Sequence, residues 1–377
     1  MGDKSSIQWT NATWNPIAGC KIHSPGCKFC YAMHEAARQI RCAAGLKRET
    51  HYAGTVEVRD GRPIWTGKIN AAPDRVWELP LRWRKPRMIF VNSMSDLFAE
   101  NVPDDWIDRA LAIMALSPQH TFQVLTKRSA RMRRYFAGIE GMENCPPARW
   151  ALIEGMAQAE YARLHPDEDR DAIGMTLAVH GPLSNVWLGV STERQQEADE
   201  RIPDLLATPA AIRFISAEPL IGQIDLTNHC NGHYFFDSLR GTRWHDAPGY
   251  EFAHEKFCDG IDWVIAGGES SRLAVEQPRP MHPQWARSLR DQCAAAGVPF
   301  FFKQWGDYHP ALDHSDTCKA TPNAIHVSGK REYRPSEEFS LVANRAEGWV
   351  GMCRLGVAKA GRILDGRTHD DLPKVPA

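Results

Sequence analysis

The sequence carries almost no net charge. Its 377 residues include 45 Lys and Arg against 46 Asp and Glu, which gives a formal charge of −1 at pH 7. A chain with this balance lacks the strong positive field of many nucleic-acid-binding proteins. Any contact with nucleic acid would therefore have to use a local basic patch.

Long apolar runs are also missing. A transmembrane helix needs a run of about eighteen or more apolar residues, and the sequence has none. The first six residues, MGDKSS, lack the apolar core of a secretory signal peptide. We therefore expect a soluble, cytoplasmic protein with no membrane partner. In that compartment its ten cysteines are expected to stay reduced, as metal ligands or packing groups rather than disulfides.

What the sequence does contain is an alternation of short apolar runs and helical segments. The runs that predict strands are residues 7–15, 88–91, 121–125, 186–190, 212–215, 263–266 and 298–302. Helical spacing of apolar residues predicts helices over 31–42, 104–116, 129–136, 193–206 and 283–296. Apolar strands that alternate with helices are typical of a parallel sheet buried on both faces. The prediction is an α/β fold, a complete or partial (βα) barrel of parallel strands.

The predicted barrel occupies residues 1–306. Residues 44–85 are polar and are expected to cross the surface. Two insertions interrupt the barrel, one at about 138–182, expected to be helical, and one at about 226–261. Residues 307–377 form a C-terminal extension that we expect to pack on the barrel.

Small polar or charged residues follow each strand-like run. In α/β barrels the carboxyl ends of the strands meet at one rim, where the chemistry is collected. The alternative is that these residues, Ser191, Ser270 and Asp96 among them, only cap the helices that follow. Because so many polar ends would share one rim, a functional site is the preferred interpretation.

Three cysteines lie close together in the chain: Cys20, Cys27 and Cys30, spaced C-x6-C-x2-C. Gly and Pro between the first two allow the loop to fold back, so the three thiolates could converge. A zinc ion would need a fourth ligand, for which His23 is a candidate. Three thiolates without a fourth ligand suit an iron–sulfur cube that leaves one iron open for a substrate or cofactor.

The stretch from Cys27 to Cys30 resembles the second half of the radical S-adenosylmethionine (SAM) signature, C-x3-C-x-aromatic-C. The resemblance implies a radical SAM-like barrel in which Cys20, Cys27 and Cys30 hold a [4Fe-4S] cluster. It implies that Phe29 packs near the adenine of SAM, whose amino and carboxylate groups chelate the fourth iron. It further implies a 5′-deoxyadenosyl radical and an electron donor such as flavodoxin or ferredoxin. The first gap is six residues where the signature has three, so the first loop must be longer.

The chain also resembles a family named mainly by its phage origin. The shared stretches are WTNATWNP at residues 9–16, SPGCKFCYA at 24–32, and then NSMSDLF, LTKR, GVS, SAEPL, GGES, FFKQWG and LDGR. In the tail, His369 stands where this family leads us to expect Trp. The resemblance implies a bacterial or phage-infected host.

If SAM binds, the rim is expected to supply its polar contacts. The expected cofactor contacts are Asp96 or Glu218 with Ser93 for the ammonium, Lys127 or Arg128 for the carboxylate, and Ser191 and Glu193 for the ribose. Residues expected to face the substrate are Gly267, Gly268, Glu269, Arg279 and His282.

Two further segments suggest ligands. The second insertion contains a C-x2-H…H-x3-C pattern, a candidate structural zinc site formed by Cys230, His233, His254 and Cys258; the alternative is an ordered loop with incidental Cys and His. The basic, aromatic-containing segments 82–87 and 127–135 make nucleic acid a candidate substrate, for repair or base modification. The alternative interpretation is that these basic residues only form solvated helix faces.

Two other functions stay open. The chain could be a zinc-binding phage-accessory or interaction protein without catalysis. It could also be a metal-dependent hydrolase or nuclease on a barrel, using the rim carboxylates of Asp96, Glu193, Glu218 and Glu269.

Overall fold

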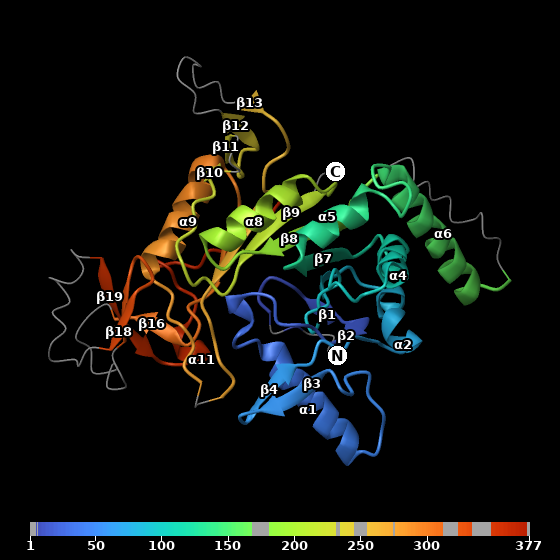
Figure 1. Ribbon diagram of the computed structural model, residues 1–377, viewed down its shortest axis with the longest axis horizontal. Coiled ribbons are helices and arrows are strands. Elements are labelled where there is room, and N and C mark those ends of the chain that lie inside the picture. The colour runs from blue at the N-terminus through green and yellow to red at the C-terminus, as the bar shows by residue number, and fades with distance from the viewer. Residues whose placement is uncertain are drawn as a thin grey trace.

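A seven-stranded parallel sheet forms the centre of the molecule (Figure 1). The computed structural model describes residues 5, 7–167, 181–230, 234–244, 255–273, 276–311, 323–333 and 348–374. The strands of the sheet stand side by side in chain order: β1 (Ala12–Trp14), β6 (Met88–Val91), β7 (Thr121–Thr126), β8 (Val186–Ser191), β9 (Ile212–Ala217), β14 (Trp263–Gly267) and β15 (Phe300–Gln304). Every neighbouring pair is parallel.

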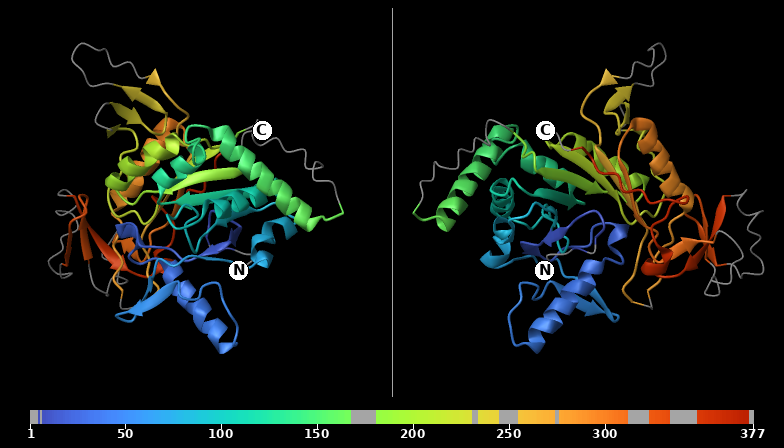
Figure 2. Two further views of the ribbon diagram at one scale, coloured as in Figure 1. Left: turned by 45° about the vertical axis from the view of Figure 1, so that its right-hand side comes forward. Right: turned by 180° about the vertical axis from the view of Figure 1, so that it is seen from behind.

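The sheet curls into a half-barrel, with β1 and β15 at its two edges (Figure 2). The predicted α/β fold with a parallel sheet is therefore confirmed, and the barrel is partial rather than complete. Since all strands point the same way, their carboxyl ends share one rim, as the polar strand ends predicted.

Helices pack around the larger of the apolar cores, with α8 against β8 and α9 against β14 and β15. The helices of the described chain are α1 (Tyr31–Gly45), α2 (Asp74–Trp77), α3 (Leu79–Arg82), α4 (Asp104–Ala115), α5 (Ser129–Ala137), α6 (Pro146–Leu164), α8 (Gln195–Leu206), α9 (Pro283–Ala296) and α11 (Val357–Ala360), with a 3-10 turn η1 (Pro25–Cys27). The five helices predicted from periodicity all form, with ends shifted by at most three residues. Helix α6 accounts for the helical part of the first insertion.

A second core, largely aromatic, fills the inside of the half-barrel. It contains Trp9, Phe90, Trp187, Phe214 and Trp263. The Trp9 ring meets the Phe90 ring edge-on at 4.8 Å, and meets the Trp263 ring at 6.2 Å. Alternate residues of the inner strands point inward, so these side chains form a floor beneath the carboxyl-end rim.

Four smaller sheets surround the half-barrel. Their strands are β2 (Ile17–Ala18) with β5 (Asn70–Ala71); β3 (Val56–Arg59) with β4 (Arg62–Trp65); β10 (His229–Cys230), β11 (Phe235–Asp237), β12 (Thr242–Trp244) and β13 (Glu255–Lys256); and β16 (Tyr308–Pro310), β17 (Asn323–His326), β18 (Arg331–Tyr333) and β19 (Trp349–Arg354). The β3–β4 hairpin, the sheet of β10 to β13 and the sheet of β16 to β19 lie apart from the central sheet, at its periphery (Figure 1).

The end of the chain returns to the exposed edge of β15. The Phe302 N–H donates to the carbonyl of His369 at 2.9 Å, and the Trp263 indole donates to the carbonyl of Asp371 at 2.8 Å. The His369 ring packs edge-on against the Phe300 ring at 5.7 Å. His369 is the position at which the family resemblance led us to expect Trp. An unpaired sheet edge is thereby covered.

Three sequence expectations differ from the structure. The first strand is shorter than residues 7–15, because Trp9 turns into the half-barrel instead of pairing. Residues 44–85 are not only a polar surface crossing: Trp77 is buried and meets Trp14 edge-on at 6.3 Å. Cys353 is disulfide-bonded, although reduced thiols were expected. The prediction of reduced cysteines was based on the average redox conditions of the cytoplasm. Those conditions do not determine whether one particular thiol forms a disulfide.

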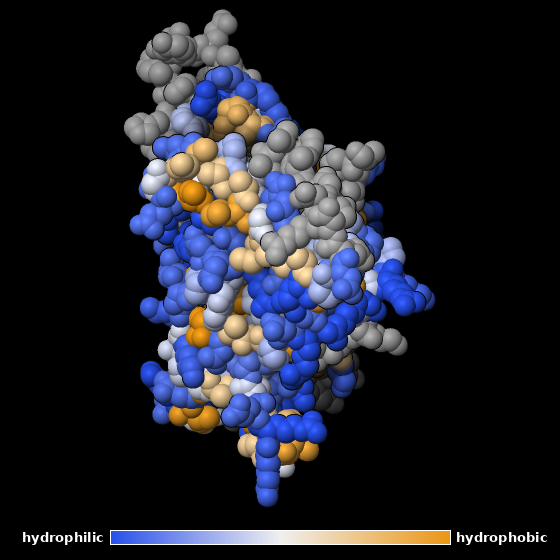
Figure 3. All heavy atoms as spheres, turned by 90° about the vertical axis from the view of Figure 1, so that its right-hand side faces the viewer, coloured by the Kyte–Doolittle hydropathy of each residue, from blue (hydrophilic) through white to orange (hydrophobic). Residues whose placement is uncertain are grey.

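The face that Figure 3 turns to the viewer is mostly hydrophilic, with apolar side chains in small scattered groups. Leu152 on α6 and Met142 are among the exposed large apolar residues. Single exposed apolar side chains of this kind are ordinary on protein surfaces. Of the helices in the described residues, none is both long and apolar enough to cross a membrane.

Candidate functional site

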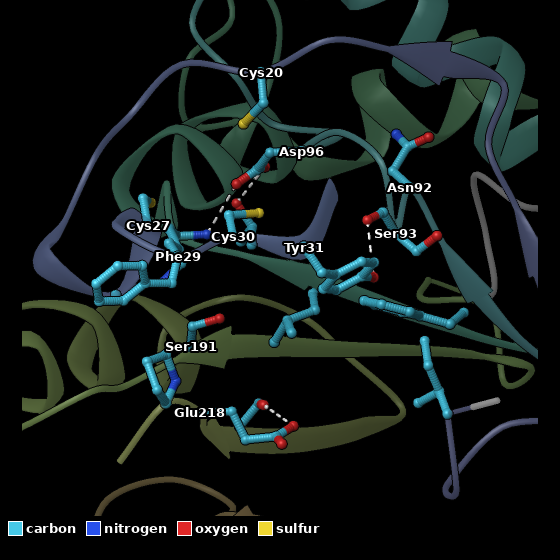
Figure 4. Close-up of a pocket in the computed structure, with 18 of the residues that line it drawn as sticks. Cys20, Cys27, Phe29, Cys30, Tyr31, Asn92, Ser93, Asp96, Ser191 and Glu218 are labelled. Atoms are coloured by element: carbon cyan, nitrogen blue, oxygen red, sulfur yellow. Dashed lines mark hydrogen bonds between the residues drawn. The ribbon is translucent and has the colours of Figure 1, made fainter. Parts of the chain in front are cut away.

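A cavity opens at the carboxyl-end rim of the sheet (Figure 4), and Trp9 and Phe90 of the aromatic floor are among the residues that line it. It holds about 240 Å³ of space for solvent. Its walls come from the cysteine-containing loop, residues 19–30, and from residues at or just after the carboxyl ends of β6, β7, β8, β9, β14 and β15. We call residues 19–30 the cysteine loop. The polar strand ends that the sequence singled out thus meet around one cavity.

Cys20, Cys27 and Cys30 all line this cavity. Each sits at a turn of the cysteine loop: Cys20 follows β2, Cys27 ends η1, and Cys30 is the N-cap of α1. Gly19 has φ +96 and its Cα lies against the carbonyl of Lys68, so a side chain there would clash with backbone. This glycine makes the sharp turn into the loop.

The three thiols differ in their ionisation. Burial raises the pKa of Cys20 to about 12, against the opposing effect of Arg128. Burial also raises the pKa of Cys30, as does the charge of Cys27. Burial would raise the pKa of Cys27 too, but the Lys127 ammonium and backbone hydrogen bonds in the loop outweigh it and lower that pKa. The thiols act on one another because they face the same space.

A fourth ligand is not evident in the described part of the chain. His23, the candidate, is exposed and does not line the cavity. Among the described residues, no group of three or more His, Cys, Asp and Glu side chains converges on a point where a single metal ion could sit. Cys20, Cys27 and Cys30 thus share one cavity, but their side chains do not form a metal-binding group in this conformation.

The first anchor of the cysteine loop is Glu193, which follows β8 and is completely buried. One of its carboxylate oxygens accepts from the Ser24 hydroxyl at 2.6 Å and contacts the Lys127 ammonium. The other accepts from Arg201 at 3.0 Å. The Gly26 Cα also lies close, because a Cβ added there would come within 2.5 Å of the carboxylate. The loop is thereby bonded to the strand ends of β7 and β8.

The second anchor is Asp96, which follows β6. Its carboxylate accepts four hydrogen bonds, including 2.7 Å from the Thr126 hydroxyl and 3.0 Å from the Arg128 guanidinium. The same guanidinium donates to the carbonyl of Lys21 at 2.8 Å. Asp96 thus fixes Arg128, and Arg128 holds the loop.

The third anchor is Glu269, which follows β14. It receives the Arg279 guanidinium at 2.8 Å and the Arg279 backbone N–H at 2.7 Å. Arg279 then donates to the carbonyl of Pro25 at 2.8 Å. Each anchor is a buried acid paired with a base, and each holds an atom of the cysteine loop.

These anchors change the roles expected from the sequence. Asp96 has no free lone pairs to offer an ammonium group, and Glu193 lies beneath the loop instead of lining the cavity. Arg279 holds the loop rather than facing a substrate. Arg201 and Ser24 were missed, because nothing in their local sequence indicates a partner far along the chain.

A different ion pair lies on the far side of the cavity. Glu218 follows β9, and Lys303 is the residue before the last of β15; the lysine ammonium lies 3.0 and 3.2 Å from the two carboxylate oxygens. The Ser216 hydroxyl donates to the same carboxylate at 3.3 Å. Both charged side chains line the cavity. Lys303 was missed as a site residue, although it directly follows the predicted strand 298–302, and this position identified the other candidates.

Several other predicted residues also line the cavity. These are Phe29, Ser93, Lys127, Arg128, Ser191, Gly268 and Glu269. Ser93 donates to the Asn15 side chain at 3.1 Å, and its carbonyl accepts from the Tyr31 hydroxyl at 3.0 Å. Asn92, not predicted as a site residue, also lines the cavity with a buried amide that has no hydrogen-bond partner, and has φ +55. Asn tolerates this left-handed conformation, and a buried amide without a partner is typical of functional sites.

Some predicted residues lie elsewhere. His282 caps α9, accepting from the Gln284 N–H at 3.1 Å, and lines a separate pocket beside the C-terminal sheet, because the chain turns away from the rim after Arg279. Gly267 lies against Glu218 and not on the cavity wall. Of the zinc candidates, Cys230 is exposed at the edge of β10 and Cys258 is half-buried; His233 and His254 lie outside the described residues.

The basic side chains of segment 127–135 are paired with acids, and in segment 82–87 Arg82 is paired. On α5, Arg131 contacts Asp104, and Arg133 lies 3.3 Å from Asp204. Arg82 lies 2.5 Å from Glu78, one turn earlier. Paired guanidinium groups attract phosphate less than free ones, so segment 127–135 adds little to the prediction of a nucleic-acid surface.

Comparisons with known proteins bear on the family alone. No curated protein and no solved structure matches the chain. One family model, described as a protein of unknown function (DUF5131), matches residues 4–373. The match spans nearly the whole chain, and the chain therefore belongs to the DUF5131 family.

Proposed function

We propose that this protein is a radical SAM-type iron–sulfur enzyme. The observation that carries the proposal is that Cys20, Cys27, Cys30 and Phe29 line one cavity at the carboxyl-end rim of a parallel half-barrel. That rim is where α/β barrels collect catalytic groups.

A [4Fe-4S] cluster with one open iron needs three cysteine ligands. Cys20, Cys27 and Cys30 line the cavity and supply that number, although their side chains do not form a metal-binding group in this conformation. The long first gap is compatible with a fixed geometry, because Lys21, Ser24 and Pro25 within it are each held by an anchor. A loop fixed at three points can present its thiols in one arrangement.

When bound, a cluster of this kind and SAM supply a 5′-deoxyadenosyl radical by one-electron reductive cleavage, with the electron from a donor such as flavodoxin or ferredoxin. The chain supplies position and exclusion of water. Cys20, Cys27 and Cys30 would hold the cluster, and Phe29 would pack on the adenine. The aromatic floor closes the cavity from below, so a reactive species would be kept from solvent on that side.

The hydrolase alternative has less support. Metal-dependent hydrolases need carboxylates free to bind cations. Asp96, Glu193, Glu218 and Glu269 are each paired with Arg or Lys. The zinc-binding accessory alternative depends on Cys230 and Cys258 together with two histidines outside the described residues, so it stays a prediction.

The test is anaerobic reconstitution with iron and sulfide. We expect broad visible absorbance and dithionite-dependent formation of 5′-deoxyadenosine from SAM. Cys27→Ala should lose both, whereas Cys42→Ala, an exposed cysteine on α1 outside the cavity, should retain both. Wild-type protein that stays colourless and binds zinc would overturn the proposal in favour of the accessory function.

A further inference from the structure

The Glu218–Lys303 pair differs from every other ion pair around the cavity. The bases on the cysteine side each hold an atom of the cysteine loop: Lys127 bonds Ser24, Arg128 bonds Lys21, and Arg279 bonds Pro25. No hydrogen bond joins Glu218 or Lys303 to the cysteine loop in the described structure. Their side chains stay 14% and 20% exposed, on the cavity wall.

The surrounding chain keeps this pair open toward the cavity. β9 and β15 flank β14, so the two side chains approach each other across the end of the strand between them. That strand ends in Gly267, whose Cα lies directly beneath the Glu218 carboxylate. Any side chain at 267 would occupy the space of the carboxylate. The glycine therefore lets the ion pair lie across β14 at the rim.

The pair offers one kind of recognition. The lysine ammonium has three donors, and the carboxylate has acceptor capacity beyond the bonds from Lys303 and Ser216. Because the two charges cancel, a ligand with net charge of either sign would meet one repulsive partner. A neutral group with a C=O beside an N–H satisfies both side chains, with the N–H donating to Glu218 and the C=O accepting from Lys303.

Aromatic walls select the shape of that ligand. Tyr31 lines the cavity between Ser93 and Glu218 in the view of Figure 4. Its ring is held by the bond from its hydroxyl to the Ser93 carbonyl. Trp65 and Phe90 line the same cavity. Rigid rings of this kind bind planar heterocycles by stacking.

We infer that Glu218 and Lys303 form the substrate subsite and bind a nucleobase through a lactam or imide edge, in which a ring C=O adjoins a ring N–H. The inference rests on the proposed function, whose substrate class it names. The base could belong to a free nucleoside or to a single strand of nucleic acid, since both present the same edge.

The test measures binding to the reconstituted full chain with two matched probes. Uridine has the imide edge, and N3-methyluridine is the same molecule without the N–H. We expect uridine to bind at least about tenfold more tightly than the methylated probe, the discrimination given by one lost hydrogen bond to a buried group. A uridine-containing single-stranded oligonucleotide forms the second arm: binding of the oligonucleotide alone assigns the substrate to a strand, and binding of uridine assigns it to free nucleosides.

Lys303→Met and Glu218→Gln are the variants, and Lys359→Met on α11 is the control. Each cavity variant should weaken binding of the favoured probe at least about tenfold more than it weakens SAM binding. The control should change neither. Equal loss of SAM and probe binding would overturn the inference and assign the pair to the cofactor. The inference would also be overturned if neither uridine nor the oligonucleotide bound. A wild-type protein that binds uridine but forms no cluster would contradict the proposed function while leaving the subsite intact.

Discussion

On the cysteine side of the cavity, three acids bind bases that also hold the cysteine loop, and all three carboxylates are buried. On the far side, Glu218 binds Lys303 and the pair stays partly open to the cavity. The chemical groups are the same on both sides, and their exposure and partners differ. This comparison indicates that the charged residues beside the cysteines hold the cysteine loop in place, whereas Glu218 and Lys303 remain available to a ligand.

The largest effect should come from removing a buried anchor. Glu193 lies between Lys127 and Arg201, so Glu193→Ala leaves two largely buried cations without their counter-charge. We expect the free energy of unfolding to fall by about 3–5 kcal/mol. Chemical denaturation measures this directly, and Glu193→Gln should retain part of the stability by keeping the hydrogen bond to Ser24.

Glu57→Ala is the matched control, because Glu57 is exposed on the β3–β4 hairpin and pairs only at the surface. Its effect should stay within about 0.5 kcal/mol. If the two substitutions lower the free energy of unfolding by the same amount, Glu193 does not stabilise the fold. The distinction between charges that hold the loop and charges available to a ligand would then be wrong.

A smaller effect should come from crowding the same anchor. In Gly26→Ala the new Cβ would lie 2.5 Å from the Glu193 carboxylate, so the cysteine loop must shift away from the rim. Overpacking of this kind typically costs about 1–3 kcal/mol. We also expect reconstituted iron content to fall, because the shift moves Cys27, the next residue.

Gly155→Ala is the control for the effect of replacing a glycine by alanine where the new Cβ contacts nothing. Gly155 lies inside α6 with open space around the position of a Cβ, so alanine there should stabilise the helix by about 0.5–1 kcal/mol and leave iron content unchanged. A Gly26→Ala protein with normal iron content would show that the contact with Glu193 does not set the position of the thiols.

Much of this arrangement follows from patterns that are local in the sequence. Apolar strands alternating with helices predict a parallel sheet, and a parallel sheet brings every carboxyl end to one edge, so polar residues such as Ser191 and Glu218 were expected to meet. The cysteine loop comes after the first predicted strand, residues 7–15, so its three cysteines and Phe29 belong to the same edge. Curvature is not local, and the choice between a complete and a half-barrel depends on how the edges of β1 and β15 are covered.

The pairings at the rim could not be predicted from the sequence. Lys127 and Glu193 are 66 positions apart, and Arg279 reaches the carbonyl of Pro25 across 254 positions. An acid that follows a strand has the same sequence signature whether it holds a loop, as Glu193 does, or faces a cavity, as Glu218 does. Only the positions of the bases separate the two roles, and these are set by tertiary packing.

The smallest effect should come from an ion pair that is neither buried nor at the rim. Asp365, in the C-terminal extension, accepts from Arg287 and Arg290 on α9. Hydrogen bonds from these guanidinium groups, that of Arg287 first, lower the pKa of Asp365 to about 2. Asp365 has φ +50, a conformation that Asn also tolerates, so Asp365→Asn removes the charge with little change in backbone preference.

The pH dependence of this pair has a definite sign. The pKa in the folded state is below the unfolded value of about 3.9, so the unfolded chain binds the proton first as the pH falls. The contribution of Asp365 is complete above about pH 4 and is lost as the pH falls toward 2. Since the side chain is 35% exposed, solvent screening reduces the contribution to the order of 1 kcal/mol. Denaturation of wild-type and Asp365→Asn proteins should therefore differ by that amount at pH 7 and converge near pH 2. A difference that persists there would show that the side chain acts through packing and not through its charge, and the exposed pair would then belong with the architectural anchors.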